Sequence, residues 1–202
     1  MVPMERALAE AGFHVLNVGY PSRTTSIGHL AGTVVPEAIG KCRDGGATRI
    51  HFVTHSLGGI LVRAFLSANA MQDLGRVVML GPPNQGSEVV DVLGRYWIFG
   101  KLNGPAGREL GTGADSTPNR LGPVTFPLGV IAGDQSVNWI NSLWIRGDDD
   151  GKVSVERTKV AGMTDHIVVH AAHPFLMRDA RAIRQTIRFL RTGTFERASA
   201  DR

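Results

Sequence analysis

Short apolar runs alternate along most of the chain with segments whose apolar residues recur at helical spacing. Runs rich in β-branched and aromatic residues predict five strands, at residues 13–20, 50–53, 76–80, 128–132 and 165–171. Helical spacing predicts four helices, at residues 3–11, 26–41, 57–68 and 174–190. Strands that alternate with helices build a parallel sheet with right-handed crossovers. The pattern therefore predicts an α/β fold.

Composition indicates a single globular domain over residues 1–202. The 202 residues contain 43% hydrophobic and 20% charged side chains, enough to bury one core. The net charge of +4 comes mostly from scattered arginines, and no Lys/Arg run with interleaved aromatic residues suggests a nucleic-acid partner. The single cysteine, Cys42, excludes an internal disulfide and cannot form a metal cluster alone.

The sequence shows no sign of a membrane protein. No apolar run is long enough to span a bilayer. Glu5, Arg6 and Glu10 interrupt the first residues, which therefore lack the pattern of a signal peptide. We expect a chain without stable membrane insertion that stays in the cytoplasm.

The connection between the strand at 50–53 and the helix at 57–68 is too short for a loop. Such a tight turn forces its central residue, Ser56, into a strained conformation that lifts the hydroxyl clear of the sheet. The turn also places Ser56 at the positive end of the following helix, where an anionic intermediate is favoured. Thr54 and Gly58 are small, as close packing of strand and helix requires. Ser56 is a candidate nucleophile; the alternative is a buried serine in an ordinary strand–helix unit.

A serine hydroxyl becomes a good nucleophile only when an imidazole takes its proton. Of the seven histidines, His173 alone lies in a turn, between the last strand and the last helix, where it can reach over the strand ends. His170 is the next candidate. His55 precedes Ser56 and is expected to pack beneath the turn as a supporting residue. The other four fall inside predicted strands or helices: His14, His29, His51 and His166.

The imidazole needs a carboxylate that fixes its tautomer, and two aspartates compete for this role. Asp134 directly follows the strand at 128–132. Asp150 begins an Asp-Gly-Lys-Val segment, in which glycine permits a tight turn and valine returns the chain inward. Its neighbours Asp148 and Asp149 allow the alternative of a solvated acidic loop. Composition does not separate these candidates.

Over residues 3–195 the chain resembles bacterial lipase-like α/β-hydrolases, the esterase/lipase class. The resemblance rests on these motifs: Tyr20-Pro-Ser22, Thr54-His-Ser-Leu-Gly-Gly59, Pro83-Asn-Gln-Gly-Ser87, Asp150-Gly-Lys-Val153 and His173. It implies a three-layer sandwich with a mostly parallel sheet of about five to six strands. It also implies Asp150 as the catalytic acid and the N–H of Leu57 as an oxyanion donor. No cofactor and no metal are implied.

The chain departs from this family at its N-terminus. The family begins with a strand ending in a His-Gly loop, whose N–H supplies half of the oxyanion hole, and nothing here precedes residues 1–5. The sequence therefore resembles an N-terminally truncated member. We expect the strand at 13–20 to pair directly with the strand at 50–53, or a second copy to pair with the exposed sheet edge in a homodimer.

These residues predict a serine hydrolase that cleaves carboxylic esters of short or medium acyl chains through an acyl-enzyme. Thioesterase or acyltransferase activity would use the same three side chains. A different class of function is an inactive scaffold that binds a ligand or partner. The stretch at 91–127, which carries Tyr96, Trp97 and Phe99, is expected to form either a cap over Ser56 or a surface excursion anchored by its aromatic residues.

Overall fold

A computed structural model describes residues 1–93, 104–136, 144–145 and 147–197. The helices and strands in these ranges follow one another along the chain as α1 (Val2–Glu10), α2 (Ile27–Asp44), β1 (Ile50–His55), α3 (Leu57–Ala68), β2 (Leu74–Leu80), α4 (Glu88–Leu93), α6 (Thr117–Arg120), β3 (Leu128–Gly133), α8 (Val155–Thr158), β4 (Asp165–Val169), the 3-10 helix η1 (His173–Arg178) and α9 (Ala180–Thr192).

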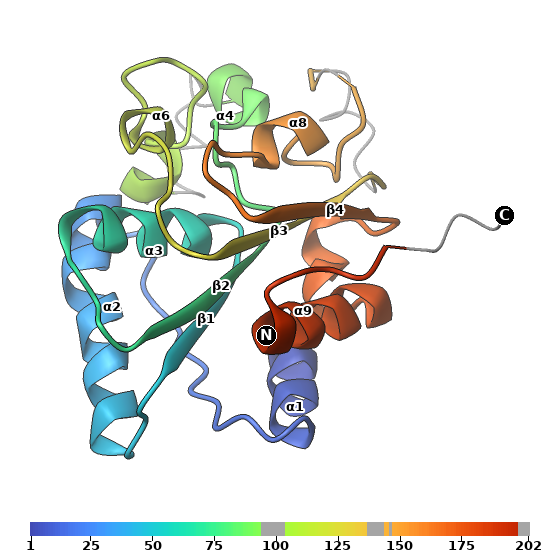
Figure 1. The fold of residues 1–202 in the computed structure, drawn as a ribbon. Coiled ribbons are helices and arrows are strands. Elements are labelled where there is room, and N and C mark those ends of the chain that lie inside the picture. The colour runs from blue at the N-terminus through green and yellow to red at the C-terminus, as the bar shows by residue number, and fades with distance from the viewer. Residues whose placement is uncertain (94–103, 137–143, 146, 198–202) are drawn as a thin grey trace, which may run out of the picture.

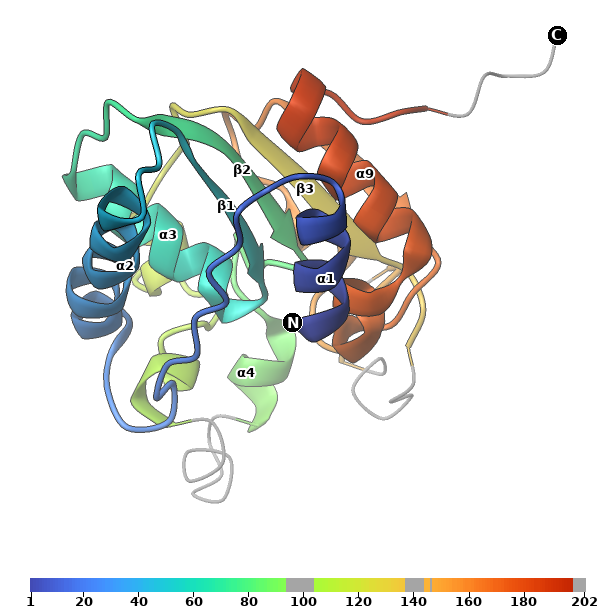
Figure 2. The ribbon, with the colours of Figure 1, turned by 90° about the horizontal axis from the view of Figure 1, so that it is seen from below.

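The strands form one parallel sheet in the order β1-β2-β3-β4. Helices α2 and α3 cover one face of this sheet, and α1 and α9 cover the other (Figures 1 and 2). The predicted α/β three-layer sandwich with a parallel sheet is therefore confirmed. The short helices α4, α6 and α8 lie at the top of Figure 1, on the same side of the sheet as α3.

β2 shows why a continuous apolar run forms a strand here. Val78 and Leu80 are fully buried in the core shared with α1 and α9. Val77 and Met79, which point to the opposite face, are fully buried in a second core on the α3 side. Because side chains alternate between faces, a strand covered by helices on both sides needs apolar residues at every position.

The sheet has four strands in the described residues, where about five to six were expected, because the predicted strand over residues 13–20 is wrong. This segment runs between α1 and α2 without strand pairing. Phe13 meets His51 of β1 ring to ring at 6.0 Å, so side chains rather than backbones join the two segments. Its alternation is still visible: Val15 packs on the core, whereas Leu16 and Val18 are exposed. Pairing through a second copy stays a prediction.

The last predicted helix is divided in two. Pro174 lies in the first turn of the 3-10 helix η1, and Asp179 then caps α9 by accepting a hydrogen bond from the N–H of Ala182 at 2.8 Å. Gly193 ends α9 in the left-handed conformation, with φ 86°. α9 buries Phe189 and Leu190 and exposes its arginines.

The structure does not test two further predictions, the cap and the single domain. Residues 94–103, within the expected cap at 91–127, lie outside the described residues, so the cap stays a prediction, as does the single domain over 1–202. Among the described helices, none has both the length and the apolar character that crossing a membrane would require.

Candidate active site

Ser56 forms the turn between β1 and α3. Its backbone has φ 54° and ψ −125°, and it is the one non-glycine residue with positive φ in the described part of the chain. L-residues rarely adopt this conformation, so the turn is strained. The Ser56 N–H donates to the carbonyl of Leu80 at 2.9 Å, which ties the turn to the end of β2. The expected tight strand–turn–helix connection is therefore present.

Small residues around the turn let α3 begin very close to the sheet. A Cβ added to Gly59 would lie 3.0 Å from Met79 Sδ, and one added to Gly58 would lie 3.4 Å from the Tyr20 hydroxyl and 3.5 Å from Thr54 Cβ. The Thr54 hydroxyl is buried and has no hydrogen-bond partner among the described residues. Thr54 therefore contributes its small size to this packing.

The structure brings Ser56, His173 and Asp150 into one hydrogen-bonded relay. His173 Nε2 lies 2.9 Å from Ser56 Oγ, and His173 Nδ1 lies 2.7 Å from Asp150 Oδ2. A carboxylate only accepts hydrogen bonds, so Nδ1 carries the proton and Nε2 is free to accept the serine proton. His173 and Asp150 are buried, 3% and 1% exposed, so water does not compete with their contact.

The loop of Asp150 is held by its own side chain and by the histidine. Asp150 Oδ1 accepts hydrogen bonds from the N–H groups of Lys152 at 3.0 Å and Val153 at 2.9 Å. Its carbonyl oxygen accepts from the N–H of His173 at 2.8 Å. Gly151 has φ 93°, which only glycine adopts without strain. The glycine of the Asp-Gly-Lys-Val segment thus serves the tight turn expected from the sequence.

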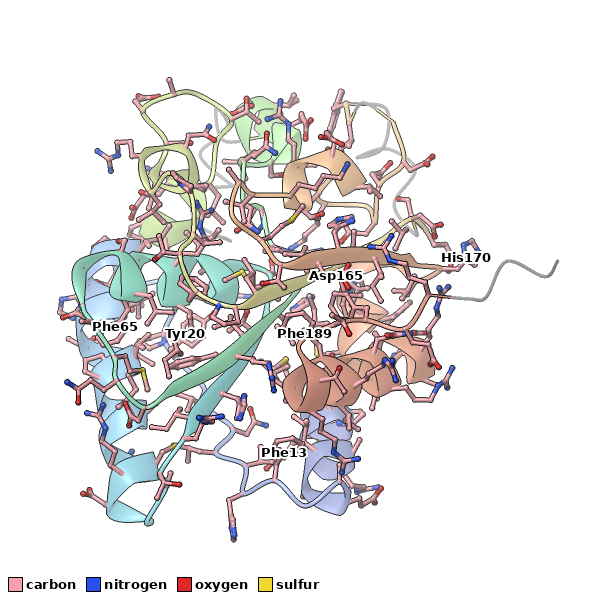
Figure 3. All side chains as sticks on the ribbon, in the orientation of Figure 1. Phe13, Tyr20, Phe65, Asp165, His170 and Phe189 are labelled. Atoms are coloured by element: carbon pink, nitrogen blue, oxygen red, sulfur yellow. The ribbon has the colours of Figure 1, made fainter. Side chains whose placement is uncertain are left out.

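The two competing candidates pair with each other and not with Ser56. His170 Nδ1 lies 2.9 Å from Asp134 Oδ1, and the His170 side chain is 77% exposed. β4 ends at Val169, so His170 follows the strand and does not lie within it, and Figure 3 shows it past the right-hand end of β4.

His55, expected from the sequence to pack beneath the turn, lies against His173 in the structure. Its Nε2 lies 2.9 Å from the carbonyl oxygen of His173, and the two rings are 4.7 Å apart. A carbonyl only accepts, so His55 Nε2 carries the proton. Burial, together with the charge of His173, lowers the pKa of His55 to about 4. His55 is thus neutral near pH 7 and holds the backbone of His173.

A cleft of about 260 Å³ opens beside Ser56. Leu57 lines it together with Pro83, Val90 and Leu110, so part of its wall is apolar. Leu57 is the first residue of α3, and its N–H has no carbonyl one turn earlier in the helix to bond. This N–H and the positive end of α3 are suited to stabilising an oxyanion next to Ser56.

No protein-family model matches the chain, and no curated protein matches its sequence. Solved structures do match it. A Bacillus licheniformis lipase, BlEst2 in its mature form, superposes with a TM-score of 0.69 at 18% identity over 85% of this chain and 76% of the lipase. The phospholipase PlaB from Legionella pneumophila gives 0.70 at 19% identity, over 96% of this chain and 56% of the phospholipase. The chain has the α/β-hydrolase fold.

A thermophilic esterase from Thermogutta terrifontis also shares this α/β-hydrolase fold, with a TM-score of 0.54 at 15% identity over 94% of this chain and 85% of the esterase. The chain spans little more than half the length of the phospholipase. Among the described residues, no three His, Cys, Asp or Glu side chains are grouped in a way that could hold a metal ion.

Sequence reasoning missed a buried cation that holds the loop containing Asn84. Arg63 of α3 is 3% exposed and donates to Asn84 Oδ1 at 3.0 Å and to the carbonyls of Pro118 and Gly122. Asn84 donates in turn to the carbonyl of Thr158 at 2.7 Å. Burial lowers the pKa of Arg63 to about 10, which leaves it charged at neutral pH. The sequence did offer a signal for this buried cation, because Arg63 is a charged residue within the apolar run of α3.

Proposed function

We propose that this protein is a serine hydrolase that cleaves carboxylic esters through an acyl-enzyme. The observation that carries the proposal is the relay from Asp150 through His173 to Ser56, with contacts of 2.7 and 2.9 Å at a strained strand–helix turn. Two contacts of this length aligned on the two nitrogens of one imidazole are the arrangement that activates a serine. The fold shared with lipases and esterases supports the same reaction class.

In the first half of the reaction, Ser56 Oγ bonds to the ester carbonyl carbon while its proton moves to His173 Nε2. The carbonyl oxygen becomes an oxyanion, which accepts a hydrogen bond from the Leu57 N–H. Asp150 stabilises the resulting imidazolium through Nδ1–H. His173 then gives its proton to the alcohol oxygen, the C–O bond breaks, and the acyl group stays on Ser56.

In the second half, water takes the place of the alcohol. His173 removes a proton from water as it attacks the acyl carbonyl, and the proton then passes to Ser56 Oγ when the acid departs. The substrate, water and the three side chains supply every proton and electron pair in these steps, so the cycle needs no further reactant. The cycle ends with Ser56 and His173 in their starting protonation states.

The cleft volume favours small acyl groups. About 260 Å³ is below the range of about 300–1,000 Å³ that drug-sized ligands occupy. We therefore expect 4-nitrophenyl acetate and butyrate to be hydrolysed with a higher kcat/KM than the octanoate. A series of these three esters tests the size preference directly.

The proposal is tested by hydrolysis of the same esters by the wild type and Ser56→Ala. Because triad members act as a unit, the variant is expected to lose on the order of 10⁴ or more in kcat. Ser67→Ala is a matched control, since Ser67 lies exposed on the same helix and its hydroxyl donates only to the carbonyl of Ala64. Equal loss in both variants, or full activity of Ser56→Ala, would overturn the proposal.

A further inference from the structure

The cleft beside Ser56 is lined by two cations and, among its lining residues, by no carboxylate. Arg23 and Lys152 belong to this lining, on segments far apart in the sequence. Among the described residues, neither side chain makes a hydrogen bond or an ion pair with another side chain. The carboxylates near the site do have hydrogen-bond partners, so Arg23 and Lys152 differ from them in lacking one within the described ranges.

The nearby carboxylates are bound elsewhere. Glu88 pairs with Arg157 at 2.5 Å. Asp91 accepts from both the N–H and the hydroxyl of Thr112, at 2.9 and 2.5 Å. Glu109 accepts from the N–H of Ile27 at 2.9 Å and from the Thr117 hydroxyl at 2.8 Å. Each of these three carboxylates thus has a recorded partner other than Arg23 or Lys152.

Both cations are carried by backbone that the fold holds in place. Lys152 donates its N–H to Asp150 Oδ1 at 3.0 Å, and its carbonyl accepts from the Ser87 hydroxyl at 2.7 Å. The backbone of Arg23 packs so closely on Gly104 that a Cβ there would lie 2.2 Å from the Arg23 carbonyl oxygen. The backbone therefore holds both residues at the cleft rim, and their exposed side chains carry the two positive charges there.

The charge of Lys152 also reaches the site. The pKa of His55 is lowered first by burial and then by neighbouring charges, and the Lys152 ammonium is one of them. The positive end of α3 adds to the same field at Ser56. Before the reaction begins, a neutral ester has no net charge for these cations to attract, whereas a negatively charged substrate is attracted on entry and in the cleft.

We propose that the ester cleaved at Ser56 carries an anionic group, such as a carboxylate, which Arg23 and Lys152 bind at the rim of the cleft. This inference rests on the proposed function. It narrows the substrate class from esters in general to small anionic esters. Esters with a long neutral chain on both sides of the scissile bond fit neither the charge nor the volume of the cleft.

The test compares two pairs of probes that differ mainly in charge. Monomethyl glutarate carries its carboxylate on the acyl side and is compared with dimethyl glutarate; O-butyrylglycolate carries it on the alcohol side and is compared with its methyl ester. Initial rates give the ratio of kcat/KM for the anionic ester to that for the neutral ester. We expect this ratio to exceed one for at least one pair.

Charge-removing variants connect the ratio to the two side chains. Since an exposed ion pair is worth a factor of about two to five, Arg23→Gln and Lys152→Gln are each expected to lower the ratio by that factor, and the double variant by roughly tenfold. Arg184→Gln removes an equal charge from the exposed face of α9 and should leave the ratio unchanged. Raising salt from about 0.01 M to about 1 M should lower the wild-type ratio by screening.

A binding measurement separates this inference from the proposed function. Ser56→Ala, which keeps both cations, is titrated with monomethyl and dimethyl glutarate and with both butyryl esters by calorimetry. Tighter binding of an anionic ester, weakened in the double Gln background, supports the inference even if hydrolysis fails. Equal binding of charged and neutral esters, or a ratio that the double variant does not change, would overturn it while leaving Ser56-dependent hydrolysis intact.

Discussion

Replacing Asp150 by asparagine changes one carboxylate oxygen to an amide nitrogen with almost no change in shape. The orientation of the new amide is set by the loop. Asp150 Oδ1 accepts from the N–H groups of Lys152 and Val153, and an amide can keep both bonds only by placing its oxygen there. The NH₂ group then faces His173 Nδ1, at the position of the 2.7 Å contact.

An NH₂ group donates, so Nδ1 must become an acceptor and the ring proton moves to Nε2, which can no longer accept from Ser56. Restoring the active tautomer requires the amide to flip and to abandon two buried N–H groups. Each such group costs about 1–3 kcal/mol, or about 2–6 kcal/mol in total. At about 1.4 kcal/mol per factor of ten, kcat should fall by about 30-fold to 10⁴-fold.

The assay is kcat on 4-nitrophenyl butyrate, corrected for uncatalysed hydrolysis, with far-UV circular dichroism and Tm as checks on folding. Asp134→Asn is the matched control, because Asp134 makes the same kind of contact with His170 at 2.9 Å, but in an exposed pair. We expect this control to keep kcat close to that of the wild type. A larger loss in Asp134→Asn than in Asp150→Asn would refute the reasoning.

Two further predictions concern the surroundings of the relay. Burial lowers the pKa of His55 to about 4, so the unfolded chain binds a proton more readily than the folded one. The free energy of unfolding should therefore fall by up to about 3 kcal/mol as the pH drops from about 6.5 to about 4. Urea titrations should show a weaker pH dependence of this free energy in His55→Gln than in the wild type. A Cβ on Gly81 would lie 2.9 Å from Asp150 Oδ2 and 3.1 Å from His173 Nδ1, so Gly81→Ala should lower stability by about 1–3 kcal/mol and also reduce kcat. Gly46 also has positive φ but lies in open space, so Gly46→Ala should reduce stability alone. Equal kcat in the two variants would contradict this prediction.

Much of the fold could be predicted because local pattern and tertiary burial agree. β2 is apolar at successive positions and is covered on both faces, so its run identified a buried strand. The turn at Ser56 could be predicted because strand and helix leave no residues for a loop. Placing His173 in the relay followed from its position between the last strand and the last helix.

The remaining features depend on contacts between distant segments. Residues 13–20 have a strand-like alternation, but pairing needs a neighbouring backbone, and the Phe13 and His51 rings lie between the segments. Asp134 and Asp150 were indistinguishable by composition, because only the folded loops decide which histidine each one meets. The resemblance to lipases favoured Asp150, and the structure brings this residue to His173.

The central claim is that Ser56 is an activated nucleophile, and a fluorophosphonate probe tests it without knowledge of the natural ester. Such a probe forms a covalent adduct only with a serine that a base has activated. We predict that intact mass spectrometry of the wild type shows a single adduct, that peptide mapping places it on Ser56, and that His173→Gln labels far more slowly. Absence of an adduct in the folded wild type, or undiminished labelling of Ser56→Ala, would contradict the account.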